Sequence, residues 1–175
     1  MAGLIVHEWV EQSGGSELVV DEFVRTFPGS DLFVLWDDAP GRFGVRPQES
    51  WLAATPLRGR KALALPLMPS TWRAMPQKRE YDWLLVSSHL FAHHARLGGR
   101  NSVPKLVYAH TPARYIWEPD LDRRGASPLA RAAATVLKPL DRRRSAEAEA
   151  VVANSEFTRQ RIQRTKFEDR ATAPV

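Results

Sequence analysis

The chain has 175 residues, of which 43% are hydrophobic, so it is long and apolar enough for one globular domain with a sizeable core. It contains no cysteine, which excludes disulfides, thiolate metal sites and a thiol nucleophile. The net charge of +5 is uneven: residues 1–90 carry 9 Lys and Arg against 11 Asp and Glu, whereas residues 91–175 carry 16 against 9.

The first elements predicted along the chain are a strand, a helix and a second strand. The apolar run from Gly3 to Val6 predicts the first strand, and a loop containing Gly14 and Gly15 follows it. Apolar residues then recur at helical spacing over residues 18–27, and Pro28-Gly29 ends the helix. Residues 31–36 predict the next strand. A right-handed crossover between the two strands makes them a parallel pair.

Residues 40–80 contain many prolines and predict only short elements, around residues 51–57 and 63–67, with a helix beginning near Ser70. Residues 81–88 form an apolar strand that ends in two serines. Residues 89–97 predict a helix that Gly98-Gly99 ends. Residues 105–109 predict the next strand.

The last third continues the alternation of helices and strands. Ser127-Pro128 marks the start of an alanine-rich helix that runs toward Ala150, with a kink expected at Pro139. A strand over 150–153, a helix from Asn154-Ser155 to about Lys166 and the start of a strand at 171–175 follow. Apolar strands alternating with helices predict an α/β fold, a doubly wound, mostly parallel, Rossmann-like sheet.

His110 follows the strand over 105–109 directly and is the strongest candidate for a site residue. The carboxyl ends of parallel strands are where open α/β sheets bind ligands. His110 could hydrogen-bond a sugar hydroxyl, act as a general acid or base, or be structural. Arg114 could bind a phosphate or carboxylate. Tyr115 and Trp117 could stack on a sugar ring, or pack locally beneath the next loop.

The loop with Gly14 and Gly15 has two readings. Its backbone N–H groups could approach a phosphate at the helix N-terminus, or the glycines could serve chain reversal alone. Glu17, in the first helical turn, is best explained by helix capping. The motif Gly-x-Gly-x-x-Gly is absent, which disfavours a nicotinamide or flavin cofactor, and no P-loop occurs.

Two further clusters are best explained structurally. His89 and His93 have a spacing that could hold a metal on a helix, but no third ligand is evident, so a solvent-edge helix and no metal are expected. The run Arg142-Arg143-Arg144 could approach anionic lipid or a phosphorylated acceptor, but a solvated helix face explains it better. Aromatics are not interleaved with the charge, which argues against a nucleic-acid partner.

Taken together, several motifs resemble the amino-terminal domain of the family 4 retaining glycosyltransferases. They are the Gly14-Gly15-Ser16-Glu17 loop, Tyr81-Asp82 with Ser87-Ser88, the run Tyr108-Ala109-His110-Thr111-Pro112-Ala113-Arg114-Tyr115-Ile116-Trp117, and Asn154-Ser155-Glu156-Phe157 with Arg161-Ile162. The bacterial mannosyltransferase-like enzymes of surface-polysaccharide assembly are the most similar subgroup.

The resemblance implies half of a GT-B architecture, in which two Rossmann-like domains face each other across a cleft. Gly14 and Gly15 would face the donor diphosphate, and His110 would reach the transferred sugar as the catalytic residue. Arg114, Tyr115 and Trp117 would lie on the acceptor side. The nucleotide-sugar is a substrate, and no cofactor or metal is implied.

We therefore expect residues 1–175 to be the acceptor-side domain of a glycosyltransferase whose donor-binding domain is absent, with little activity alone. The acceptor would be lipid-linked or a saccharide, and the location cytoplasmic. Peripheral contact with the inner membrane face and homodimerisation stay open. One alternative is a non-catalytic module from a truncated gene that binds an acceptor or partner. A basic nucleic-acid-binding domain ranks below both.

Overall fold

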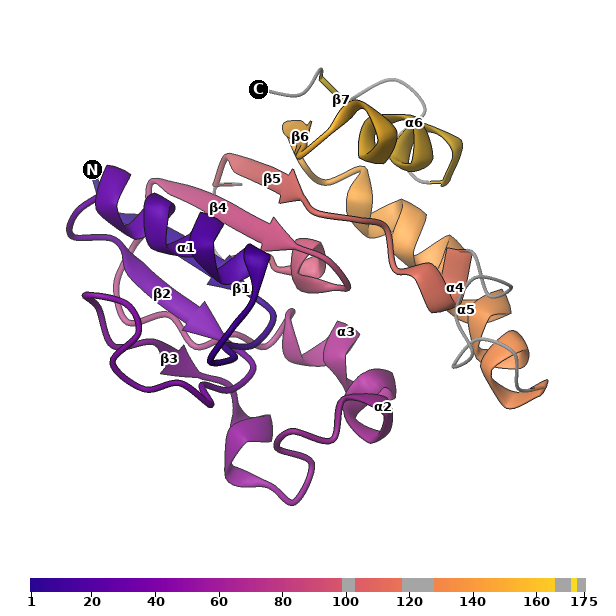
Figure 1. Ribbon diagram of the computed structural model, residues 1–175, viewed down its shortest axis with the longest axis horizontal. Coiled ribbons are helices and arrows are strands. Elements are labelled where there is room, and N and C mark those ends of the chain that lie inside the picture. The colour runs from indigo at the N-terminus through magenta and orange to yellow at the C-terminus, as the bar shows by residue number, and fades with distance from the viewer. Residues whose placement is uncertain (99–102, 118–127, 166–170, 173–175) are drawn as a thin grey trace.

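The computed structural model describes residues 1–98, 103–117, 128–165 and 171–172, without the side chains of residues 114, 115, 128–133, 171 and 172. Its centre is a seven-stranded sheet in which every pairing of neighbouring strands is parallel (Figure 1). The strand order is β3-β2-β1-β4-β5-β6-β7. The strands are β1 (Gly3–His7), β2 (Asp31–Val34), β3 (Gln48–Glu49), β4 (Trp83–Ser88), β5 (Lys105–Ala109), β6 (Ala150–Ala153) and β7 (Ala171–Thr172).

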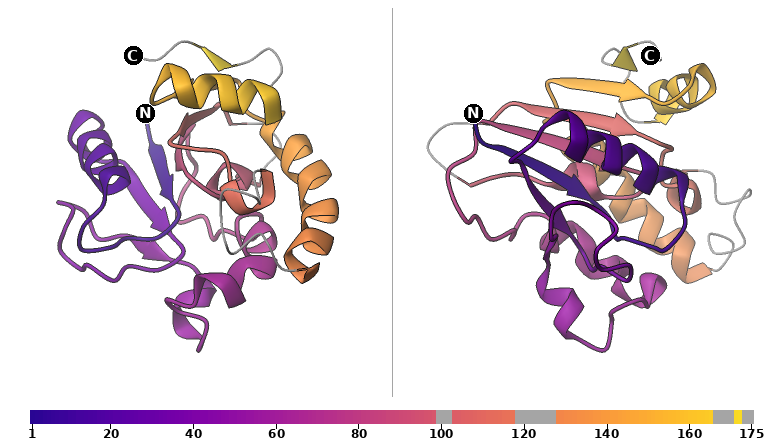
Figure 2. Two further views of the ribbon diagram at one scale, coloured as in Figure 1. Left: turned by 45° about the vertical axis from the view of Figure 1, so that its right-hand side comes forward. Right: turned by 60° about the vertical axis from the view of Figure 1, so that its left-hand side comes forward.

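Helices cover both faces of the sheet, with α1 on one side and α5 on the other (Figure 2). The α-helices are α1 (Gly15–Thr26), α2 (Lys61–Ala64), α3 (Met68–Thr71), α4 (Arg114–Trp117), α5 (Pro128–Ser145) and α6 (Glu156–Thr165). Short 3-10 turns are η1 (Trp51–Ala54), η2 (Leu65–Leu67) and η3 (Ala92–His94). The Rossmann-like α/β fold expected from the sequence is confirmed.

The core forms two layers because side chains alternate across a strand. On β1, Leu4 and Val6 join the larger apolar cluster, which also contains Trp72 and Phe91, whereas Ile5 joins the smaller cluster beneath α1. All five residues of β1 are buried. A strand that is buried on both faces reads as a continuous apolar run, which is why the sequence identified it.

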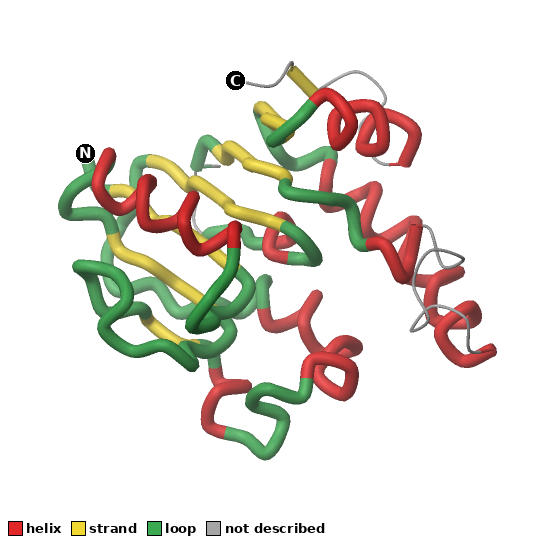
Figure 3. Tube along the Cα trace, viewed as in Figure 1, coloured by secondary structure: helices red, strands yellow, loops and turns green. Residues whose placement is uncertain are grey.

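Most predicted elements occur where the sequence placed them. The strand over 105–109 and the strand over 150–153 match β5 and β6, and the helix over 18–27 corresponds to α1. The second strand is shorter than predicted, because it ends at Val34 instead of Trp36. A helix does begin close to Ser70, at Met68, but it is a short one that ends at Thr71 (Figure 3). Residues 173–175 of the predicted last strand lie outside the described residues.

The predicted helix over residues 89–97 is wrong. Only residues 92–94 form a single turn, η3. Glu8, the residue after β1, accepts hydrogen bonds from the backbone N–H groups of Leu90 and Ala92, at 2.8 and 2.9 Å from Oε1. The first turn of any helix leaves such N–H groups without intrahelical partners, so Glu8 caps the turn. The helix does not continue, because Lys105 binds the carbonyls of His93 and Ala95 and the backbone leaves the helical region at Ala95.

Candidate functional site

The candidate site lies at the carboxyl edge of the sheet, where β1, β4 and β5 end side by side. The chain leaves these three strands at His7-Glu8, Ser87-Ser88-His89 and His110 respectively. Parallel pairing in register brings them together, since His7 pairs with Ser87 and Ser88 pairs with Ala109. We call His7, Glu8, Ser87, His89 and His110 the edge cluster.

The Gly14-Gly15 loop borders the same edge, and Glu17 explains why position 14 is glycine. The buried Glu17 carboxylate accepts hydrogen bonds from Ser16 Oγ at 2.8 Å and from the Glu11 backbone N–H at 3.1 Å. A Cβ added at Gly14 would lie 2.1 Å from Glu17 Oε2. At Gly15 a Cβ would meet nothing within 4 Å, so the backbone there is open.

The Glu17 carboxylate interacts electrostatically with the imidazoles of His7 and His110. Burial by itself would raise the pKa of Glu17, but the Ser16 hydroxyl, backbone N–H groups and His7 lower it below its ordinary value. The Glu17 charge also acts on His110, as one of the weaker influences on the pKa of that ring. The predicted phosphate-facing loop and His110 therefore lie in one region. The hydrogen bond from the Glu11 N–H shows that Glu17 holds the preceding loop, and α1 has no side-chain cap at its N-cap residue, Gly14.

His110 is partly buried and held from two directions. Its backbone N–H donates to the carbonyl of Ser88 at 2.9 Å, and its carbonyl accepts from Thr158 Oγ1 at 3.3 Å. Its ring Nε2 lies 2.8 Å from Ser87 Oγ. Burial, reinforced by His7, lowers the pKa of His110 to about 4, so the ring is neutral at pH 7.

His7 is the hidden member of the edge cluster. It is fully buried, and its Nδ1 lies 3.0 Å from Ser87 Oγ and 3.3 Å from the Ser87 carbonyl oxygen. Burial lowers the pKa of His7 despite the neighbouring Glu8 carboxylate, which acts to raise it. Its Nε2 has no hydrogen-bond partner among the residues that the structure describes.

Glu8 is a buried anion that organises the segment after β4. Besides the N–H groups of Leu90 and Ala92, its Oε1 accepts from Ser88 Oγ at 3.2 Å. Burial would raise the pKa of Glu8, but His89, His7 and these backbone donors together lower it to about 2. The carboxylate therefore stays ionised at neutral pH, where it fixes the loop that carries His89.

His89 stands at the mouth of the edge cluster, with 24% of its side chain exposed. Its Nδ1 lies 3.3 Å from Glu8 Oε2, and its ring meets Trp9 edge-on at 4.8 Å between centroids. The ring centroid of His110 is 6.4 Å away. The solvent-edge helix predicted for His89 and His93 is wrong, because His93 is buried and the helix is absent.

The three predicted acceptor-side residues lie on α4, which begins four residues after His110. The side chains of Arg114 and Tyr115 lie outside the described part of the structure. Trp117 donates its indole N–H to Asp141 Oδ2 at 2.7 Å, and Arg142 lies 4.9 Å from its ring centroid. The indole nitrogen of Trp117 therefore already has a partner within the protein.

Asp141 gathers a second polar network that the sequence did not reveal. Its Oδ1 lies 2.7 Å from His93 Nε2 and 2.9 Å from His94 Nε2. Within the described residues, His93, His94 and Asp141 form one of two groups with a geometry suited to a metal, the other being His7, Glu8 and His89. In the first group both imidazoles hydrogen-bond the Asp141 carboxylate, whereas in the second His89 Nδ1 lies 3.3 Å from Glu8 Oε2 without a hydrogen bond. The expectation of no metal stays a prediction.

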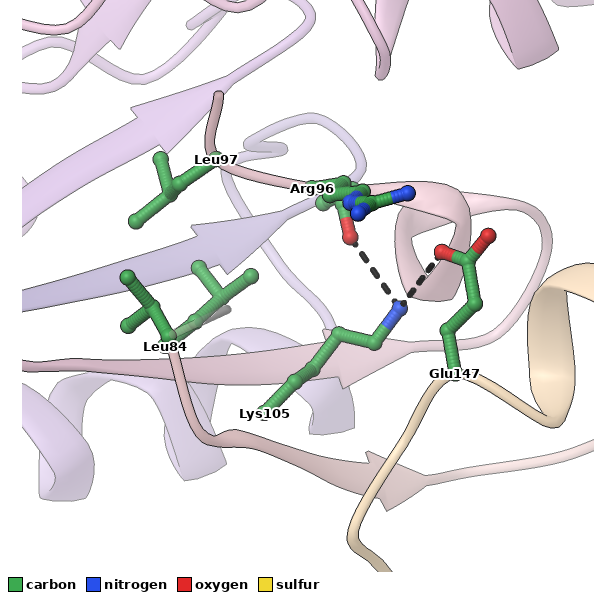
Figure 4. Close-up of a pocket in the computed structure, with 7 residues that line it drawn as sticks. Leu84, Arg96, Leu97, Lys105 and Glu147 are labelled. Carbon is green, nitrogen blue, oxygen red and sulfur yellow. Dashed lines mark hydrogen bonds and ion pairs between the residues drawn. The ribbon is translucent and has the colours of Figure 1, made fainter. Parts of the chain in front are cut away.

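Two cavities lie away from the edge cluster. One of about 630 Å³ follows β2 and is lined by the loop residues Phe43, Arg46 and Arg58, among others. The other, of about 240 Å³, lies at the beginning of β5, the opposite end of that strand from His110 (Figure 4). There Lys105 donates to the carbonyls of His93 and Ala95, and burial lowers its pKa to about 8.

Sequence reasoning singled out Gly14, Gly15 and His110, weighed His89 only as a metal ligand, and assigned no role to His7, Glu8 or Ser87. The missing signal was available: polar residues directly follow two further strands, at His7-Glu8 and at Ser87-Ser88-His89. Applying the strand-end rule to every strand, rather than to β5 alone, would have placed these residues at one edge.

A doubly wound parallel sheet with titratable groups gathered at its carboxyl edge is the architecture of an α/β ligand-binding or enzyme domain. The comparison with family profiles gives the particular family. Residues 13–172 match the profile of Glycosyltransferase Family 4, so the chain belongs to this family. The resemblance to this family seen in the sequence is thereby confirmed.

Among solved structures, the chain is similar to the apo form of the lipopolysaccharide outer core galactosyltransferase WaaB, at 12% sequence identity and a TM-score of 0.48. The match covers 99% of this chain and 45% of that one, so this chain spans less than half of that protein's length. The comparison with curated proteins found no match. Among the described residues, no helix combines the length and apolar character needed to span a bilayer.

Proposed function

We propose that the edge cluster and the Gly14-Gly15 loop handle the reacting end of a nucleotide-sugar during retaining transfer of the sugar to a lipid-linked or saccharide acceptor. Family membership supports the class of reaction. The observation that carries the residue assignment is that a neutral His110 lies at the same carboxyl edge as the open backbone of Gly15. A neutral imidazole suits an uncharged sugar hydroxyl, whereas a helix N-terminus suits a phosphate.

In this proposal, residues 1–175 form the acceptor-side half of a GT-B enzyme, and a partner domain supplies the cationic groups that stabilise the leaving diphosphate. Stabilisation of developing negative charge is the largest single contribution in transfers of this kind. The edge cluster and the adjacent loop are not suited to that task alone, because they contribute two buried carboxylates, Glu8 from the cluster and Glu17 from the loop, and imidazoles with lowered pKa values at His7 and His110. We therefore expect the chain by itself to turn over slowly or not at all.

The acceptor side would lie beyond His110, around α4 and α5. Arg114 and Tyr115 are proposed to meet the acceptor, and Trp117 to hold α4 against α5 through Asp141. Synthesis of cell-surface polysaccharide is the proposed biological setting, with the nucleotide-sugar as substrate and no cofactor. Contact with the inner face of a membrane and formation of a homodimer are further parts of the proposal to be measured.

A transfer assay with labelled nucleotide-sugars tests the proposal. The chain is assayed alone and with the donor-binding domain of a family member added, using saccharide and lipid-linked acceptors. We expect product only in the combined reaction, with the anomeric configuration of the donor retained in the product by NMR. His110→Ala should abolish transfer, whereas Arg25→Ala, which removes an exposed ion pair with Asp21, should leave it unchanged.

Robust turnover by the chain alone would contradict the two-domain proposal. Absence of any effect of His110→Ala in an active combined reaction would contradict the assignment of the site. Inverted configuration in the product would contradict the retaining mechanism while leaving the sugar-transfer class intact.

A further inference from the structure

The hydroxyl of Ser87 lies between two imidazoles and contacts both. Ser87 Oγ is 2.8 Å from His110 Nε2 and 3.0 Å from His7 Nδ1. A serine hydroxyl has one proton to donate and can accept from other groups. The arrangement of protons in this chain of three residues therefore decides which nitrogen of His110 carries its proton.

The carbonyl oxygen of Ser87 determines the direction of the chain. It lies 3.3 Å from His7 Nδ1, and a carbonyl can only accept a hydrogen bond. A proton on Nδ1 of His7 serves both Ser87 oxygens, whereas a bare Nδ1 would face the carbonyl lone pairs. With its proton committed to this side, His7 Nδ1 donates to Ser87 Oγ. The proton of the fully buried Ser87 hydroxyl then has one acceptor among the described residues, His110 Nε2, and donates to it.

The unpartnered nitrogen of His7 supports the same direction. In this arrangement the fully buried Nε2 of His7 is a bare acceptor. In the reverse arrangement it would be a buried N–H donor without a partner, and such groups are rarer in proteins than under-satisfied acceptors. Both rings are neutral at pH 7, because burial lowers the pKa of each.

We propose that Ser87 and His7 are positioning residues that hold His110 in the tautomer with its proton on Nδ1, so that the ring offers an N–H donor to a ligand oxygen. His110 Nε2 is occupied by Ser87. Nδ1 makes no hydrogen bond to the described part of the chain and is left for a ligand. The sugar identity of that ligand rests on the proposed function, but the tautomer does not.

This assignment limits what His110 can do in the reaction. A ring whose free nitrogen carries the proton can donate to a hydroxyl, carbonyl or phosphate oxygen. It cannot accept a proton at that nitrogen without first losing the one already there. His110 thus binds and orients a ligand oxygen, and removal of a proton from an acceptor hydroxyl falls to another group.

Long-range ¹H–¹⁵N NMR of the ring nitrogens tests the tautomer in the 175-residue chain, without any ligand. His110→Gln identifies the resonances of residue 110. We expect Nδ1 of His110 to show the shift of a protonated nitrogen and Nε2 that of an unprotonated acceptor at pH 7. A proton found on Nε2 would overturn the proposal.

Variants of two adjacent serines make the test specific. Ser87→Ala removes the donor to Nε2, and we expect the ring to become a mixture of both tautomers. Ser87→Thr keeps a hydroxyl at this position, so we expect the tautomer of the unsubstituted protein. Ser88→Ala is the matched control, because the Ser88 hydroxyl is bound to Glu8 and His93 instead. An unchanged tautomer in Ser87→Ala would overturn the positioning role.

His7 is tested through an isosteric pair. His7→Asn keeps an N–H donor near the place of Nδ1 and should preserve the tautomer of His110, whereas His7→Leu should not. If either His7 variant fails to fold, the Ser87 series still decides the question. These measurements use no sugar, so they are valid whether or not transfer activity is found. If His110 proves to be the other tautomer, the proposed transfer function is not contradicted.

Discussion

Two buried polar networks in this protein differ in which side-chain nitrogens they leave without a hydrogen bond. The Asp141 network, formed by His93, His94, Trp117 and Asp141, directs three side-chain nitrogens onto one carboxylate. The edge cluster leaves the second nitrogen of His110 and of His7 without a hydrogen bond among the described residues. The first ties α4, α5 and the segment after β4 together, whereas the second leaves Nδ1 of the partly buried His110 free for the ligand that we propose.

The comparison shows that burial and histidine content do not by themselves mark a site. Both networks contain histidines on short polar segments, and both have metal-like geometry. They differ in position. The edge cluster lies where parallel strands end, whereas the Asp141 network joins α5 to α4 and to η3. The predictions below remove members of each network and ask whether stability and ligand handling separate as this contrast requires.

The largest expected effect is on stability, from Glu8→Ala. The substitution leaves several buried donors without their shared acceptor, including the N–H groups of Leu90 and Ala92. We expect unfolding free energy to fall by about 4 kcal/mol, since each unsatisfied buried group costs about 1–3 kcal/mol. Urea denaturation measures it. Glu11→Gln, which removes a half-exposed carboxylate, is the control and should cost under about 1 kcal/mol.

Acid should destabilise the protein in two steps that belong to the edge cluster. The pKa of His110 is about 4 against an ordinary 6.5, so unfolded chains take up a proton between these values and stability falls there. The pKa of Glu8 is about 2 against 4.5, so its contribution is lost as pH falls from 4.5 toward 2. A shift of this size corresponds to about 3 kcal/mol for the buried Glu8.

Denaturation curves between pH 8 and pH 3 check this dependence. His110→Gln should reduce the upper step, to which the lowered pKa of His7 also contributes, and leave the lower one in place. If stability rose as pH fell from 6.5 to 4, the neutral, buried state assigned to His110 would be wrong, and the contrast between the two networks would lose its main support.

Asp141→Asn tests the other side of the comparison. The amide cannot accept the two imidazole N–H groups and the indole N–H with the strength of a carboxylate. We expect a loss of about 2–3 kcal/mol of unfolding free energy. The tautomer of His110 by NMR should stay the same, because Asp141 does not contact the edge cluster directly. A changed tautomer would show that the two networks are coupled.

Gly14→Ala and Gly15→Ala form a matched pair in the loop that borders the edge cluster. The methyl group at position 14 would collide with the Glu17 carboxylate, which is buried and has little room to move. We expect a loss of about 2 kcal/mol, in the range of overpacking a filled site. Gly15→Ala meets open space at the start of α1 and should leave stability unchanged or slightly increased. Equal effects would contradict the structure of this loop.

The smallest expected effect is from Trp117→Phe. The substitution keeps an aromatic ring beside Arg142 but removes the indole N–H that binds Asp141. We expect a loss of about 1 kcal/mol, the net value of one hydrogen bond. In the combined transfer assay the acceptor KM should change little if Trp117 is structural. A large rise in KM with unchanged stability would instead restore Trp117 to the acceptor site.

The sequence by itself predicted the alternation of strands and helices, because apolar runs and helical periodicity are local signals. The predicted bounds of β5 and β6 agree with the structure, and His110 was singled out from its position after a strand. Prediction from the sequence failed over residues 89–97, where helical residue types are present but the turn ends at Ala95, whose carbonyl is bound by Lys105 from β5. Local propensity contains no information about that partner.

Only the tertiary structure decided which polar residues meet. His7 and Ser87 are 80 positions apart, and Asp141 lies 48 positions from His93, yet each pair is in hydrogen-bond contact. Sheet order and helix packing create these contacts, and neither is encoded in the spacing of any one motif. The chain's family and fold were thus readable from local patterns, whereas the proton arrangement at His110 depends on a neighbour that folding alone brings to its side.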